Sequence, residues 1–181
     1  NAVKGAQAAT GLTDSQVIMK TNIPEGQECY EACEDLVDQG CSLIFADSFG
    51  HETYLIEAAK KYTDVQFCHA TGTRAHTEGL SNYHNAFASI YEGRYLAGVA
   101  AGLKLNEMIA NGDFTAEQAV IGYIGAYTYA EVVSGYTSFF LGARSVCPTA
   151  TMKVQFTGSW YDEAMEKEAA NALIAQGCKL I

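Results

Sequence analysis

Apolar residues follow two patterns that alternate along the chain. In QECYEACEDLVDQG (27–40) they recur at the spacing of an amphipathic helix, and the segment ends at Gly40, a residue suited to a helix C-terminus. The next segment, CSLIFADS (41–48), holds consecutive apolar residues, as a strand buried on both faces of a sheet requires. Repetition of these two patterns predicts alternating helices and strands.

The same patterns predict elements over most of the chain. We expect helices over residues 1–11, 27–40, 51–62, 83–110, 129–146 and 161–177. We expect strands over 16–23, 41–46, 65–70, 119–126 and 151–158, a further strand from 178, and a polar loop over 73–82. Ser159 is a candidate N-cap of the last helix. Strands and helices that alternate in this way form parallel βαβ units, so the predicted class is α/β.

The chain also repeats itself. A shift of 137 positions places LVDQGCSLI (36–44) on LIAQGCKLI (173–181), and residues 1–44 then show eleven identities without a gap. A match of helix, strand, helix and strand in one register predicts two lobes of like topology.

The repeat predicts more chain than is present. The second copy has a strand, 119–126, before its first helix, so we expect a corresponding strand before residue 1. The chain is then a fragment that holds lobe one without its first strand (1–115) and the beginning of lobe two (116–181). A stripe of small residues within 87–102 predicts that the long helix packs closely against a sheet.

Composition limits the class of ligand. The 181 residues are 49% hydrophobic, enough for a sizeable core, and they include 11 basic and 21 acidic residues without a cluster of basic ones. This argues against nucleic acid as a partner, since binding to phosphates needs a basic surface. The six cysteines fit no zinc-site spacing. We expect buried free thiols, with a disulfide or metal framework as the alternative.

Open α/β sheets bind ligands outside the carboxyl ends of their strands. The residues at these predicted ends are Asn22, Asp47, Ser48, Phe49, His69, Thr71, Tyr127 and Trp160. Aromatic rings stack on the faces of a flat molecule, and hydroxyl, amide and carboxylate groups bond its edges. These residues therefore predict a site for a planar small molecule with polar edges.

Several of these residues also have a purely structural interpretation. Trp160 and Phe49 can cover the core without touching a ligand, and His69 can be a hydrogen-bonded core residue. Asp47 can cap the helix that follows it. Tyr127 shares its turn with a second tyrosine, and either ring can be the one that reaches the ligand.

Motifs for catalysis are lacking in this sequence. It contains no G-x-S-x-G elbow, no Walker loop and no H-E-x-x-H. Asp47 and His69 are the only acid–base candidates at the predicted strand ends. We expect no metal, no other cofactor and no enzymatic activity.

Four stretches together resemble the basic membrane lipoprotein family, substrate-binding proteins of ABC transporters best known for purine nucleoside uptake. They are LVDQGCSLIFADSFG, EGRYLAGVAAG, IGYIGA with SGYTSFFLGARSVCP, and SWYDEAMEKEAANALIAQGCKLI, in order over nearly the whole chain. The resemblance implies a type I periplasmic-binding-protein fold of two Rossmann-like lobes. It also implies an extracytoplasmic lipoprotein, held to the cell membrane by a lipid anchor outside this chain, that hands its ligand to a cognate permease.

The resemblance assigns roles to individual residues. In the family, aromatic rings sandwich the base, and Trp160 occupies one of these positions. Ser48 and Phe49 match a Ser-Phe pair of the family. The family often has an aspartate for the sugar hydroxyls where this chain has Thr71, two residues after His69. The chain departs from the family there, which bears on its specificity for nucleosides.

Three hypotheses follow for the function. The leading one is a solute-binding protein that closes two lobes over a purine nucleoside or similar planar solute. The second is the ligand-sensing domain of a lac-repressor-type regulator, which needs a DNA-binding module before residue 1. The third is an enzyme that processes nucleosides, with Asp47 and His69 as its acid–base pair.

Overall fold

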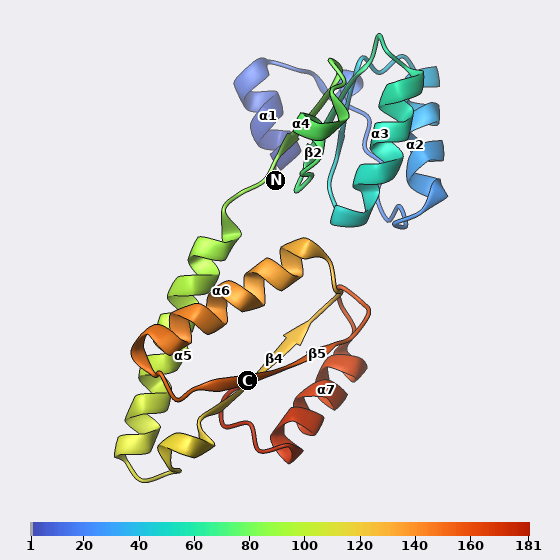
Figure 1. Cartoon of the computed structure of the whole chain (residues 1–181). Helices are drawn as coiled ribbons and strands as arrows, with labels where there is room; N and C mark the ends of the chain where they lie inside the picture. The colour runs from blue at the N-terminus through green and yellow to red at the C-terminus, as the bar shows by residue number, and fades with distance from the viewer. Residues whose placement is uncertain (1) are drawn as a thin grey trace. The chain divides into compact units, whose positions relative to one another are not determined.

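Parallel strands organise the part of the chain that the structure describes, residues 2–181. In this computed structural model, contacts between residues divide the chain into two units, Asn1–Ala88 and Ser89–Ile181. Each unit contains a parallel sheet with helices packed on it (Figure 1). The predicted α/β class with parallel sheets is therefore confirmed.

The first unit is built on a three-stranded sheet. Its strands, in their order across the sheet, are β1 (Leu43–Ala46), β2 (Gln66–Ala70) and β3 (Tyr83–Ala86). Its helices are α1 (Ala2–Thr10), α2 (Gln27–Asp38), α3 (Glu52–Lys61) and the short α4 (Ala75–Glu78), with 3-10 turns η1 (Asp14–Gln16) and η2 (Phe49–His51). The helices α2 and α3 pack side by side (Figure 1). Leu55 of α3 and Phe67 of β2 are fully buried in the core between helix and sheet.

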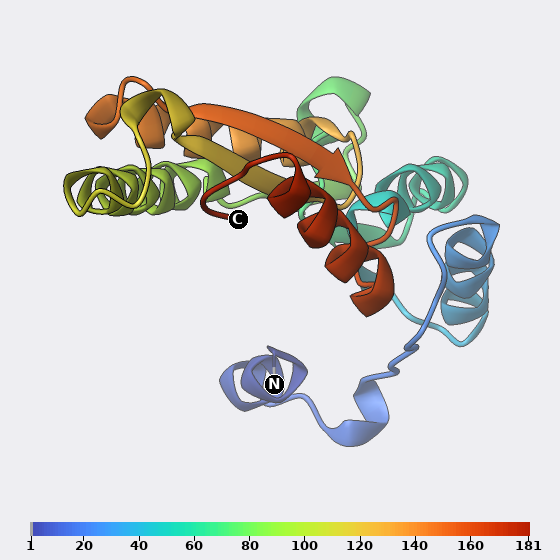
Figure 2. The same ribbon diagram turned by 90° about the horizontal axis from the view of Figure 1, so that it is seen from below.

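The second unit is built on two parallel strands, β4 (Val120–Gly125) and β5 (Thr151–Phe156). Its helices are α5 (Ile90–Ala110), α6 (Ala130–Val146) and α7 (Glu163–Ala175), with a 3-10 turn η3 (Ala116–Gln118). The helices α6 and α7 lie on opposite sides of the sheet (Figure 2).

Alternation along β4 explains this arrangement, because successive side chains of a strand point to opposite faces. The Tyr123 ring lies 5.5 Å from the ring of Phe139 on α6. A Cβ atom on the neighbouring Gly122 would instead lie 3.0 Å from Leu173 of α7. The strand is therefore covered on both faces, as its continuous apolar run predicts.

The sequence repeat is a repeat of local geometry. Gly40 after α2 and Gly177 after α7 have φ values of +84° and +89°. After each glycine, the amide of the cysteine donates to the helix carbonyl five residues earlier, from Cys41 to Leu36 at 3.0 Å and from Cys178 to Leu173 at 3.1 Å. Both helices thus end in a Schellman motif, which requires a left-handed residue and therefore favours glycine.

Two predicted elements differ from the observed ones. Residues 16–23 form no strand, and Ile18 and Met19 are 41% and 66% exposed. A strand needs ladder hydrogen bonds to a neighbour, and an apolar run does not by itself provide one. The predicted helix 83–110 is wrong at its start, because Tyr83 begins β3 and the helix starts at Ile90. The Tyr83 side chain is 2% exposed and lies in the core, and the Tyr83 backbone pairs with β2.

Smaller boundary differences have local causes. The N-cap of α7 is Asp162 and not Ser159, because Asp162 Oδ1 accepts a 2.9 Å hydrogen bond from the Met165 amide. The polar loop 73–82 contains α4. From Cys178 onward the chain forms one parallel bridge, Ile121 to Leu180. The predicted helix 1–11 is α1, and residue 1 lies outside the described residues.

The small residues of α5 pack against α6 and not against a sheet. A methyl group on Gly98 would overlap the backbone carbonyl of Phe139, and one on Gly142 would overlap that of Tyr95. The two helix backbones therefore touch. This contact groups α5 with the second unit.

We expect Gly142→Ala to lower the free energy of unfolding by about 1–3 kcal/mol, because the new methyl group forces α5 and α6 apart. Gly93→Ala on α5 is the matched control, since nothing lies within 4 Å of its Cβ position. The control should be neutral or stabilising by up to about 1 kcal/mol, owing to the better helix propensity of alanine. Urea unfolding of the full-length protein compares the two, and equal stabilities would contradict the close contact.

Candidate ligand-binding site

The carboxyl ends of β1 and β2 meet at one edge of the first sheet. The register pairs Ala46 with His69, so the residues that follow the two strands are neighbours. His69 Nε2 lies 2.9 Å from the Ser48 carbonyl and donates to it. The structure thus brings Ser48 and His69 together, as the predicted sheet implies.

Three predicted site residues have an unusual backbone. Asn22, Ser48 and Thr71 have φ values of 58°, 86° and 76°, and within residues 2–181 they are the only non-glycine residues with positive φ. Such a conformation costs about 1–2 kcal/mol per residue and persists where surrounding contacts impose it. Such conformations are concentrated at functional sites, and a role for these three residues in ligand binding stays a prediction.

Glu25 holds part of this strained region, and the sequence analysis missed it. Its Oε1 accepts hydrogen bonds from the Ser48 hydroxyl and from the Gly50 amide, the latter at 2.9 Å. The carboxylate therefore connects the segment that contains Asn22 to the loop after β1. A lone glutamate between Pro24 and Gly26 belongs to no periodic pattern or motif that would have identified it.

His51 makes a second connection between the same segments. Its Nδ1 lies 2.7 Å from the Asp47 carbonyl, and its Nε2 lies 3.1 Å from the carbonyl of Ile23 and 3.0 Å from that of Pro24. The ring therefore bridges the two loops through backbone atoms. The N-cap positions of η2 and α3 are occupied by Ser48 and His51, and not by Asp47.

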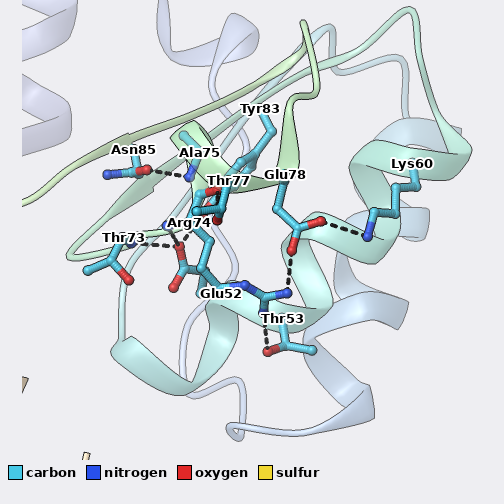
Figure 3. A network of polar contacts seen from close by, with 10 residues as sticks. All are labelled: Glu52, Thr53, Lys60, Thr73, Arg74, Ala75, Thr77, Glu78, Tyr83 and Asn85. Atoms are coloured by element: carbon cyan, nitrogen blue, oxygen red, sulfur yellow. Dashed lines mark hydrogen bonds and ion pairs between the residues drawn. The ribbon is translucent and has the colours of Figure 1, made fainter. Parts of the chain in front are cut away.

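A buried carboxylate fixes the loop after β2. Glu52 is 4% exposed, and its Oε1 accepts from the amides of Thr73 at 2.6 Å and Arg74 at 2.7 Å and from the Tyr83 hydroxyl at 2.9 Å (Figure 3). Burial and this hydrogen bond raise the pKa of Tyr83. Asn85 Oδ1 accepts from the Ala75 amide at 2.8 Å and fixes the same loop. Thr71 is therefore followed by an anchored segment.

Ion pairs extend this network outward. Glu78 pairs with Lys60 and with Arg74, and Arg74 also donates to the Thr53 hydroxyl at 3.1 Å (Figure 3). The two cations lower the pKa of Glu78. These exposed pairs contribute little to stability individually, so the buried Glu52 is the main support of the loop.

His69 occupies the core beneath the strand ends. Its side chain is 1% exposed, and its Nδ1 is buried without a hydrogen-bond partner among residues 2–181. Burial lowers the pKa of His69, so the ring is neutral at pH 7. Its bond to the Ser48 carbonyl makes it a support for Ser48, which agrees with the core interpretation of this residue.

Aromatic rings gather at the carboxyl ends of β4 and β5 in the second unit. Tyr127 stacks on Tyr129 with ring centroids 5.1 Å apart, and its centroid lies 5.2 Å from that of Trp160 in an edge-to-face contact. Trp160 remains 43% exposed and Tyr129 37% exposed. We call these three residues the aromatic cluster.

Backbone bonds fix the turn that carries Trp160. The Gly158 amide donates to the Ala126 carbonyl at 2.8 Å, which ties the end of β5 to that of β4. The buried Thr157 donates from its hydroxyl to the Ser159 carbonyl at 2.9 Å. The indole is therefore held by its own turn as well as by the tyrosines.

A pocket of about 220 Å³ adjoins the aromatic cluster, and all of its lining belongs to the second unit. Trp160 lines it together with Tyr123 of β4, Arg94 of α5, and Glu131 and Val132 of α6. Sequence reasoning missed Arg94 and Glu131, because they come from two helices far apart in the chain. A larger hollow of about 530 Å³ lies between α1 and residues 14–19, and no predicted site residue lines it.

The remaining chemistry of the chain is structural. All six cysteines are free. Cys29, Cys33, Cys147 and Cys178 are buried, as predicted, whereas Cys41 and Cys68 are partly exposed. Among residues 2–181 there is no group of three His, Cys, Asp or Glu residues that could hold a metal ion. Over the same range, no helix has the length and apolar character to cross a membrane.

Comparison with known families identifies the scaffold. The family model described as "ABC transporter substrate-binding protein PnrA-like" (Bmp) matches residues 2–181. The chain belongs to the PnrA-like family. The resemblance to the basic membrane lipoprotein family is thereby confirmed.

Two relatives of this PnrA-like chain have names that describe solute binding. A purine-binding protein of Brucella abortus (strain 2308) is 39% identical over 160 residues, 88% of this chain and 41% of the relative. A putative ABC transporter glucose-binding protein of Haloferax volcanii is 40% identical over 139 residues, 77% of this chain and 32% of that protein.

Solved structures support the fold of the PnrA-like chain. An ABC transporter solute-binding protein from Aeropyrum pernix K1 aligns with a TM-score of 0.75 at 16% identity, over 97% of this chain and 46% of that one. The predicted periplasmic-binding-protein fold is confirmed. The chain spans less than half the length of each of these three proteins.

We expect the stability of the protein to fall as the pH is lowered from about 6.5, the usual pKa of histidine, towards the lowered pKa of His69. In this window the unfolded state binds a proton that the folded state rejects, so protonation favours unfolding. Urea unfolding at pH 7 and pH 5.5 measures the effect. His69→Gln should reduce the pH dependence, whereas the exposed His76→Gln should keep it. If the free energy of unfolding of His69→Gln changes with pH as much as that of wild type, another group causes the pH dependence.

We expect Glu52→Ala to destabilise the protein by about 1–3 kcal/mol or more, because two backbone amides and the buried Tyr83 hydroxyl lose their acceptor. Tyr83→Phe, which removes only one of the three hydrogen bonds, should cost less. Glu57→Ala on the exposed side of α3 is the control and should stay within about 0.5 kcal/mol of wild type. Thermal and urea unfolding give the ranking, and a Glu52→Ala protein as stable as the control would rule out the anchoring role.

Proposed function

We propose that the full-length protein is an extracytoplasmic solute-binding protein of an ABC transporter that binds a purine nucleoside or a similar planar solute for uptake. The observation that carries this proposal is the aromatic cluster at the carboxyl ends of β4 and β5, with the adjoining pocket. Partly exposed rings at this edge of a parallel sheet offer a stacking surface to a flat ligand.

The family supports this proposal over the alternatives. Its members are substrate-binding proteins, so we expect a permease partner for the full-length protein and a place outside the cytoplasmic membrane. A lipid anchor is the means of attachment that we propose. A lac-repressor-type regulator has no such partner. For an enzyme, Asp47 and His69 would be the acid–base pair, but His69 is buried and its Nε2 serves the Ser48 carbonyl.

The purine class rests on two further points. The Brucella abortus relative is named as purine-binding, and it matches 88% of this chain. The relative named as glucose-binding matches 77%. The stacked geometry of Tyr127 and Tyr129 next to Trp160 suits a ring system. The expectation that Asn22, Asp47, Ser48, Phe49 and Thr71 contact the same ligand stays a prediction.

We expect Trp160→Ala to weaken binding of the preferred purine roughly 5- to 150-fold, the equivalent of about 1–3 kcal/mol for one lost stacking partner. Trp160→Phe should retain most of the affinity, because a smaller ring still stacks. Isothermal titration of the full-length protein measures the affinities. The ligands are adenosine, inosine, guanosine, adenine, hypoxanthine, riboflavin and glucose.

Tyr161→Ala provides the control for Trp160. Tyr161 is the next residue and is 79% exposed, so its removal should leave affinity unchanged. Heat from glucose alone would replace the purine proposal with a sugar ligand. Full affinity in Trp160→Ala would show that the indole only packs.

A further inference from the structure

We infer that Arg94 and Glu131 form hydrogen bonds with the edge of an uncharged heteroaromatic ring that stacks on Trp160. The ligand class is a nucleobase-like ring whose edge carries a hydrogen-bond acceptor next to a donor. This inference rests on the proposed function and extends it from the face of the ring to its edge.

Packing between α5 and α6 brings the two side chains to one surface. Glu131 and Gly135 are four residues apart on α6 and therefore share a helical face. A Cβ on Gly135 would lie 3.8 Å from Nε of Arg94 and 3.9 Å from its Cγ, so the arginine side chain runs over Gly135. The guanidinium of α5 thus reaches the same face of α6 that carries the carboxylate.

Local contacts hold α5 and α6 in register at this point. The Ser138 hydroxyl donates to the Tyr91 carbonyl at 2.6 Å, about one turn before Arg94. Further along, Gly98 and Gly142 bring the two backbones into contact. The position of Arg94 relative to Glu131 is therefore set by two packed helices, and not by a loop.

Both charged groups are available to a ligand. The ion pairs and side-chain hydrogen bonds found within residues 2–181 include neither the guanidinium of Arg94 nor the carboxylate of Glu131. Opposite charges at the wall of one pocket would pair directly within roughly 4 Å. Their separation leaves room for a ligand group that accepts from Arg94 and donates to Glu131.

The shape and charge of the pocket select the ligand class. Its volume of about 220 Å³ is below the roughly 300–1,000 Å³ of pockets for drug-sized molecules, so it suits a single ring system. Trp160 and Tyr123 line it with aromatic surface. One cation and one anion cancel, and the carboxylate repels phosphate, so an uncharged base fits and a nucleotide does not.

The test compares adenine and hypoxanthine with N6,N6-dimethyladenine by isothermal titration of the full-length protein. The dimethyl compound keeps the ring face, but it lacks the N6 amino hydrogens that would donate hydrogen bonds to the Glu131 carboxylate. Wild type should bind adenine or hypoxanthine at least about 10-fold more tightly than the dimethyl compound.

Two variants test the pair directly. Arg94→Met and Glu131→Met should each weaken binding of the preferred base about 10- to 100-fold, and Glu131→Met should remove most of the preference over the dimethyl compound. Lys104→Met is the control on α5, since Lys104 pairs with Glu107 and is not part of the pocket lining. Thermal unfolding verifies that each variant is folded.

The outcomes separate the inference from the proposed function. If Trp160→Ala weakens binding while Arg94→Met and Glu131→Met bind like wild type, the edge-reading pair is wrong and the function stands. If wild type binds none of the purines tested, the proposed function fails and the inference fails with it. Equal affinity of wild type for adenine, hypoxanthine and the dimethyl compound would also overturn the inference.

Discussion

Parallel pairing of neighbouring strands is the constraint on which the candidate site depends. In a parallel pair the carboxyl ends lie at the same edge, so residues that follow two different strands become neighbours. In the first unit this places Ser48 next to His69, and in the second it places Tyr127 next to Trp160. Residues separated by more than twenty positions in the chain are thereby brought into contact.

Polar side chains then determine the shape of the loops at this edge. Glu25 and His51 connect the segment before α2 to the loop after β1 by hydrogen bonds to backbone atoms. The buried Glu52 connects α3 to the loop after β2 in the same way. Such bonds offset the cost of the positive φ values at Ser48 and Thr71. A buried carboxylate that accepts several backbone donors is satisfied, whereas the same group without partners would be strongly destabilising. The loops at the strand ends are therefore held in place by the core beneath them.

The PnrA-like scaffold and the features of this chain make separate contributions to ligand chemistry. The scaffold supplies parallel sheets whose strand ends can carry a site. In this chain the strand ends carry three clustered rings, next to a pocket wall with one guanidinium and one carboxylate.

The sequence by itself determined the α/β class, most of the helices, the parallel strands and the duplicated helix ends, because periodicity and glycine placement are local properties. It also indicated the strand ends where Trp160 and Ser48 lie. It could not show that residues 16–23 lack strand partners or that Tyr83 begins a strand, because ladder pairing involves distant segments. Only the tertiary structure placed Glu25 against Ser48, and Arg94 beside Glu131 at one pocket. Their proximity results from the packing of segments that no sequence spacing connects.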